Sequence, residues 1–103
     1  YTTRGKVLES KLVAQQLMPA VESYAFERQQ WPRNLEQLGI AAPSTSDNVG
    51  SVEIDDGVII VAPAASTRIV GTLVYILKVQ GSSIVWDCTE STIEKRYLPA
   101  DCR

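Results

Sequence analysis

The longest regular feature of the sequence is an amphipathic helical pattern that runs from Thr3 to about Gln30. At 100° per residue, small and apolar residues recur at spacings of three and four and fall on one stripe. This inner stripe consists of Val7, Ala14, Leu17, Met18, Val21, Tyr24 and Ala25, with Val13 beside it. Trp31-Pro32 ends the pattern, because the residue before a proline disfavours helical backbone angles. A helix of about 28 residues would be roughly 42 Å long. The rest of the chain therefore has to pack against this one element.

Three large apolar residues, Leu8, Leu12 and Phe26, lie on the opposite and otherwise polar face of the predicted helix. Two interpretations fit them. They are isolated surface apolar residues, which are common, or they form a second contact stripe for a partner helix. Pro19 lies inside the helix and has no N–H to bond to the Gln15 carbonyl, which predicts a local kink or loosening.

Residues 31–51 are predicted to connect the helix to a sheet. Leu35, Leu38 and Ile40 indicate a short helical turn that ends at Gly39 and packs inward. The following stretch, from Ala41 to Asn48, has the composition of a loop.

From Val49 onward the apolar period changes to two, and turn residues separate four short strand patterns. Asp55-Asp56-Gly57 and Gly81-Ser82 are typical of tight hairpin turns. A helix followed by antiparallel strands predicts an α+β fold, with the long helix covering one face of a four-stranded sheet. We expect one domain over residues 1–103, made of a helix (1–30), a connecting loop (31–51), strands (52–87) and a cysteine-bounded loop (88–102).

The predicted core consists of Ala14, Leu17, Met18, Val21 and Tyr24, packed against the inward faces of these strands. On the third strand pattern, 71–80, one face carries Leu73, Tyr75, Leu77 and Val79. Trp86 is expected at the end of the sheet.

The composition argues against several classes of function. The chain has no histidine and a formal net charge of −2. The commonest general base and metal ligand is thus absent, and so is the basic footprint expected of a nucleic-acid-binding domain. The acidic turn residues Glu53, Asp55 and Asp56 could bind a hard cation such as calcium, but they lack the ligand spacing of an EF-hand loop. We predict no catalytic residue, no metal site and no cofactor.

The two cysteines, Cys88 and Cys102, both lie near the end of the chain. An even pair in a small domain favours a disulfide over catalysis or metal binding, and it indicates an oxidising compartment. On the chain-entropy model a bridge over a loop of about 15 residues is worth roughly 3 kcal/mol. Between Thr89 and Arg96 the loop has one large aliphatic residue, Ile93, so we expect the bridge to be its main restraint.

The segment Trp86-Asp87-Cys88-Thr89, followed by Leu98-Pro99-Ala100-Asp101-Cys102, resembles the carboxy-terminal disulfide loop of type IV pilins of Gram-negative bacteria. The resemblance extends to the order of elements along the whole chain. It implies that Tyr1-Thr2-Thr3-Arg4 lies where an upstream membrane-spanning half of the helix would join. On that view this piece is a soluble monomer or weak oligomer, and its full-length parent is anchored in the inner membrane with a periplasmic domain before assembly.

The resemblance also implies a function. A pilin is a structural subunit that self-associates into a helical surface filament for adhesion, twitching motility or DNA uptake. Its partners would be the pilus assembly machinery and a host surface, an abiotic surface or DNA. In this context Leu8, Leu12 and Phe26 become a favoured filament interface, and Glu94, Lys95 and Arg96 an exposed contact region. The alternative is a minor pilin or a type II secretion pseudopilin, which the stretch Trp31 to Gly39 echoes, and which would prime or cap a filament.

Overall fold

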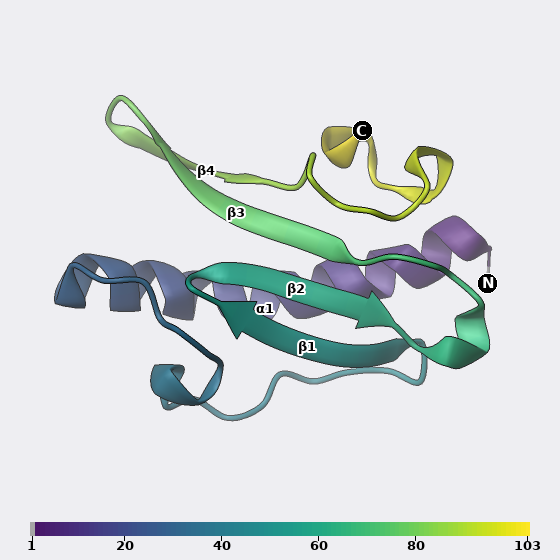
Figure 1. Cartoon of the computed structure of the whole chain (residues 1–103), viewed down its shortest axis with the longest axis horizontal. Helices are drawn as coiled ribbons and strands as arrows, with labels where there is room; N and C mark the ends of the chain where they lie inside the picture. Colours follow the sequence, from purple (N-terminus) through teal and green to yellow (C-terminus); the bar gives the residue numbers. More distant parts are fainter. Residues whose placement is uncertain (1) are drawn as a thin grey trace.

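The computed structural model describes residues 2–103, and it consists of one long helix packed on one antiparallel sheet (Figure 1). The helix α1 spans Thr3–Arg28. The strands β1 (Val49–Asp55), β2 (Val58–Pro63), β3 (Leu73–Gln80) and β4 (Ser83–Asp87) lie in the order β1-β2-β3-β4. Four short 3₁₀ turns complete the chain: η1 (Glu36–Leu38), η2 (Ala65–Thr67), η3 (Lys95–Tyr97) and η4 (Ala100–Cys102). The predicted α+β fold is confirmed. Tyr1, which the sequence placed at the junction with an upstream helix, lies outside the described residues.

Both ends of α1 are capped. At the start, the Thr2 hydroxyl accepts a hydrogen bond from the Gly5 N–H at 3.0 Å, which satisfies one of the free donors of the first turn. At the other end, Gln29 adopts a left-handed conformation with φ 56°, and its N–H bonds to the Ala25 carbonyl at 3.0 Å. The helix therefore ends at Arg28, two residues before the predicted Gln30. α1 continues through Pro19, which is exposed.

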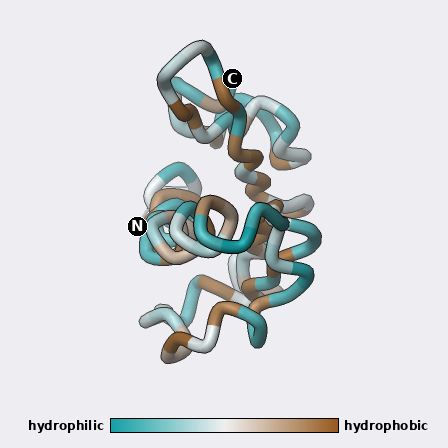
Figure 2. The backbone as a smooth tube through the Cα atoms, turned by 90° about the vertical axis from the view of Figure 1, so that its left-hand side faces the viewer, coloured by the Kyte–Doolittle hydropathy of each residue, from teal (hydrophilic) through white to brown (hydrophobic). Residues whose placement is uncertain are grey.

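The core lies between α1 and one face of the sheet. The side view in Figure 2 shows the backbone of α1 on one side of the strands. Buried side chains of the inner stripe meet alternate residues of β1, β2 and β3, namely Val7, Ala14, Leu17 and Val21 against Ile54, Ile59, Val61, Leu73 and Tyr75. Met18, Tyr24 and Ala25 were predicted to belong to this stripe but are only half-buried. The sequence placed Val13 beside the stripe, and that residue is buried.

The β1–β2 hairpin turns at Asp56-Gly57, with φ of 47° and 85°. Positive φ at both positions is the type I′ geometry that matches strand twist. The turn is docked against the connecting segment, because the Gly57 N–H donates to the Pro32 carbonyl at 2.8 Å and the Trp31 ring packs on Gly57. Strand β1 starts at Val49, three residues earlier than predicted, with an irregular register between Val49 and Ser51.

The β3–β4 hairpin extends beyond the β1–β2 pair (Figure 1). Alternating burial along β3 stops after Leu77, and Val79, which the sequence placed on the same face as Leu73, Tyr75 and Leu77, is 68% exposed. Trp86 on β4 is partly buried as expected, and its indole N–H donates to the Glu22 carboxylate at 3.1 Å. This bond ties the hairpin to α1.

The connecting segment after α1 is fixed to the side of the helix. Leu35 and Leu38 pack against the core, whereas Ile40, also predicted to pack inward, is 45% exposed. Further along, the Gln16 side-chain amide bonds to both backbone groups of Ser44, at 2.9 and 3.0 Å. The long loop is thus held by side chains of α1 rather than by secondary structure of its own.

We predict that Gly57→Ala lowers the free energy of unfolding by more than Gly39→Ala. Both glycines have positive φ, 85° and 63°, where an L side chain costs about 1–2 kcal/mol. A methyl group at Gly39 meets open space, but at Gly57 it would lie 2.5 Å from the Trp31 ring. The difference between the free energies of unfolding of the two variants, measured by urea denaturation, gives the cost of this contact. Equal losses of stability would mean that Trp31 does not support the turn.

Candidate functional site

The outer face of α1 carries an uncharged stripe. Its members recur at spacings of three and four, so they share one side of the helix. We call this set the outer stripe; it consists of Leu8, Leu12, Gln15, Pro19, Ser23 and Phe26, all of them exposed. The three large side chains, Leu8, Leu12 and Phe26, are 45%, 60% and 55% exposed. They lie opposite the buried residues of the same helix, and none of them contributes to the core.

Three charged residues that border the outer stripe, Glu9, Lys11 and Glu22, have partners elsewhere in the chain. The Glu9 carboxylate accepts a hydrogen bond from the Asn48 side chain, and hydrogen bonds from the side chains of Ser46 and Asn48 lower the pKa of Glu9. Glu22 accepts from Trp86, and Lys11 pairs with Asp101 at 3.7 Å. These three residues belong to the face of the helix that the periodicity of the sequence makes polar. They in fact attach the connecting loop, β4 and the tail to the two edges of α1.

The sequence signal for these attachments was weak. A helical projection places the three residues beside the stripe, but their partners lie far along the chain. Only the fold brings the pairs together. What remains between the two edges is the uncharged outer stripe.

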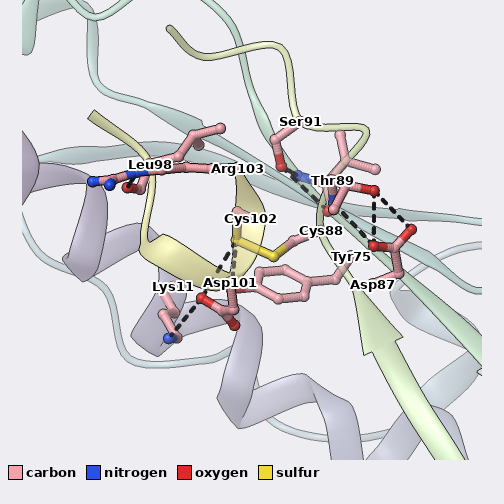
Figure 3. The surroundings of a disulfide bond; sticks show 11 residues. Lys11, Tyr75, Asp87, Cys88, Thr89, Ser91, Leu98, Asp101, Cys102 and Arg103 are labelled. Carbon is pink, nitrogen blue, oxygen red and sulfur yellow. Dashed lines mark hydrogen bonds and ion pairs between the residues drawn. A yellow bond between two sulfur atoms is a disulfide. The ribbon is translucent and has the colours of Figure 1, made fainter. Parts of the chain in front are cut away.

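The tail is closed by a disulfide between Cys88 and Cys102, with an S–S distance of 2.02 Å, as predicted (Figure 3). Both cysteines are 1% exposed and belong to the core. The Tyr75 ring lies next to the bridge, with its hydroxyl oxygen 3.9 Å from Cys102 Sγ. Burial, together with the nearby negative charge of Asp101, raises the pKa of Tyr75 to about 12. The phenol therefore stays neutral in the core at ordinary pH.

The disulfide is not the only restraint on the loop, which has more apolar burial than the sequence suggested. Ile93 and Leu98 are 2% and 1% exposed and belong to the core. Beyond the point where β4 ends, the loop follows the edge of β3. Thr92 bonds to Thr72 through its N–H and its hydroxyl, both at 2.9 Å, and the Ser91 hydroxyl accepts from the Val74 N–H. The sequence missed this pairing because Ser91 and Thr92 show no strand pattern.

Asp87 fixes the first residues of the loop. Its carboxylate pairs with Lys78 on β3 at 2.9 Å and accepts hydrogen bonds from the hydroxyl and N–H of Thr89. The hydrogen bond from Lys78, followed by those from Thr89 and then by the charge of Lys78, holds the pKa of Asp87 below its usual value. In return the pKa of Lys78 is raised.

The predicted contact residues of the loop, Glu94, Lys95 and Arg96, are all exposed. Arg96 pairs with Glu94 at 3.2 Å and lies over the Tyr97 ring at 4.7 Å. The Arg96 carbonyl accepts a hydrogen bond from Arg4 Nε at 3.2 Å. This part of the loop is therefore presented beside the start of α1, well away from Phe26.

Within residues 2–103, one group of potential metal ligands converges, namely Cys88, Asp101 and Cys102. Its two sulfur atoms are bonded to each other, so the group has no thiolate to offer. Glu53, Asp55 and Asp56 do not form such a group in the described part of the chain.

Comparison with known proteins gives the family. The model of a family described as pilin, a bacterial filament protein, matches residues 3–103. The chain belongs to the pilin family. It is 33% and 32% identical to the fimbrial proteins of Neisseria meningitidis serogroup B and of serogroup A, and the match covers the whole chain and 77% of each relative. It is 25% identical to the type IV major pilin protein PilE1 of Neisseria gonorrhoeae, again over the whole chain and 76% of that relative.

Family membership makes this pilin a structural subunit of a pilus at the bacterial surface, and self-assembly into the filament comes with that role. A structural role also accounts for a chain in which polar side chains serve mostly to hold loops in place. None of the helices in the described region has both the length and the apolar character needed to cross a membrane.

We predict that Asp87→Asn lowers the melting temperature at neutral pH and makes stability less dependent on pH in the acid range. The pKa of Asp87 is lower in the folded state than in the unfolded chain. Its contribution to stability is therefore complete at pH values above the pKa that Asp87 has in the unfolded chain. It is lost as the pH falls through the lowered folded-state value. Thermal melts of the parent and the variant from neutral pH into acid should therefore converge. A constant difference at all pH values would contradict the ion-pair account.

Proposed function

We propose that this pilin polymerises through the outer stripe of α1. The supporting observation is the division of α1 into a buried inner stripe and an exposed uncharged outer stripe on opposite sides of one helix. Of the charged residues beside the outer stripe, Glu9, Lys11 and Glu22 are bound to other parts of the same chain, whereas Glu27, next to Phe26, is exposed. A neighbouring apolar helix could therefore approach the part of the stripe from Leu8 to Ser23 without burying these three charges unpaired, which would be costly.

The outer stripe alone would give a weak contact. Each large side chain, once fully buried, is worth about 1.5–3 kcal/mol, and association itself costs several kcal/mol. The stripe would thus set the position and orientation of neighbouring subunits in the filament, and other contacts would supply most of the binding free energy. Before assembly, we propose, the full-length subunit is anchored in the inner membrane with this domain in the periplasm, where the assembly machinery collects it.

The test places Leu8→Glu and Leu12→Glu together in the full-length protein, with Leu8→Met and Leu12→Met as the matched control. Because both leucines are exposed, the melting temperature of the purified domain should stay nearly unchanged in both variants. Surface fibres, counted by electron microscopy and in sheared fractions, should be lost with glutamate and kept with methionine. A collapsed melt with glutamate would place the leucines in the domain's own core. Normal fibre numbers would remove the outer stripe from the interface.

We further propose that the assembled pilus serves in adhesion, twitching motility or DNA uptake. The contact region would be the exposed part of the disulfide loop at Glu94, Lys95 and Arg96. The loop is held by buried residues on both sides, so its charged tip is presented with little entropy left to lose on binding. A tail closed by a disulfide, rather than by a converging set of oxygen ligands, favours the pilus subunit over a secretion pseudopilin.

Replacement of Glu94, Lys95 and Arg96 by glutamine should change the free energy of unfolding by no more than about 0.5 kcal/mol, as for other surface changes. The Arg96–Glu94 pair is exposed and contributes little, and the Arg96 carbonyl remains available to Arg4. Binding of sheared fibres to host cells, to abiotic surfaces and to DNA should fall for one of the three. Unfolding of the variant, or unchanged binding to all three, would contradict this role for the loop.

A further inference from the structure

Val70 is the most exposed of the large apolar side chains, at 85%. It follows η2, in the connection between β2 and β3 at the end of the molecule where α1 starts (Figure 1). The connection is folded rather than loose. The Thr67 hydroxyl donates to the Ala64 carbonyl at 2.6 Å and accepts from the Ile69 N–H at 3.2 Å. Val70 is therefore an apolar knob held at a fixed place on the surface.

An apolar hollow lies at the opposite end of α1, between the last turn of the helix and the β3–β4 hairpin. Its volume is about 300 Å³, and its large apolar lining residues are Phe26, Trp31, Leu77 and Val79. Val79 and Trp31 are 68% and 46% exposed, so neither side chain is buried in the core of the molecule. A second, smaller hollow on Trp31 is lined by Asp56. Figure 1 shows that this end and the Val70 end are separated along the longest axis, which measures 39 Å.

The two ends also differ in charge. Two surface hollows lie near the Val70 end, and Thr3 and Tyr97 line both of them. One hollow is also lined by Arg68 and Glu94, and the other by Arg4 and Arg96. Lys95 lies next to Arg96 in the sequence. At the other end, carboxylates outnumber arginines in the last turn of α1, in η1 and in the β1–β2 turn. The residues are Glu27, Glu36, Asp55 and Asp56, beside Arg28 and Arg33. The residues near the knob therefore carry more positive than negative charge, and the segments named beside the hollow carry more negative than positive charge.

We propose that the hollow at the end of α1 receives Val70 of a second copy of this chain. The occupant is a second copy because one molecule carries both complementary surfaces, an apolar knob in a basic setting and an apolar hollow in an acidic one. Surfaces at opposite ends of a molecule form a heterologous contact, which leaves one knob and one hollow free and so extends into an open row. Phe26 joins the hollow to the outer stripe, so one copy can make both contacts at once. The inference rests on the proposed polymerisation and adds a second, head-to-tail contact to it.

The test uses fibres of the full-length protein that carry Val70→Cys and Val79→Cys in the same chain. Both positions are exposed, and the native cysteines are bonded and buried, so neither folding nor the native disulfide is disturbed. Mild oxidation of intact fibres should give a ladder of dimers, trimers and longer oligomers on a non-reducing gel, since each copy offers a knob and a hollow. Fibres with either single substitution should give at most dimers.

The matched control pairs Val70→Cys with Glu53→Cys, an exposed position on β1 outside the hollow. This pair should give no ladder. Fibres in which Val70→Cys and Val79→Cys give no ladder, or give the same ladder as the control, would overturn the head-to-tail contact and leave polymerisation through the outer stripe intact. The absence of fibres from the unmodified full-length chain would overturn both proposals.

Discussion

The packing of the inner stripe of α1 on the sheet is the contact on which the other parts of the molecule depend. Leu17 and Val21 lie against the buried side chains of β2 and β3, and each such side chain contributes about 1.5–3 kcal/mol when removed from water. Within residues 2–103 no other α-helix covers the sheet, and the inner stripe of α1 is occupied by this contact. A helix with one side committed in this way has only its other side to offer to a partner.

The attachments at the two edges of α1 follow from that arrangement. The connecting loop is bound on one edge through Gln16, and β4 and the tail are bound on the other through Glu22 and Lys11. Individually these exposed bonds are weak. Together they hold the irregular parts of the chain to the sides of the helix and leave the outer stripe uncovered. The chain therefore presents an apolar strip while its loops remain ordered.

The sequence predicts those features that depend on local patterns. The inner stripe, the Asp56-Gly57 turn and the disulfide follow from periodicity, turn chemistry and cysteine count, and the structure contains all three. Features that depend on where an element ends in space could not be predicted. Val79 continues the alternation of β3, but it lines an open hollow beside the last turn of α1 and is 68% exposed instead of packing in the core. Ile93 looks like an isolated aliphatic residue in a polar loop, yet the loop turns it into the core beside Leu98.

The central claim is that the two sides of α1 have separate roles, one in the domain and one between subunits. Cysteine accessibility in intact fibres tests it most directly. We predict that Leu12→Cys reacts rapidly with a maleimide in the purified domain and is protected in fibres, whereas Ser51→Cys, exposed on β1, reacts rapidly in both. A Leu12→Cys variant that reacts as fast in intact fibres as in the purified domain would contradict the claim.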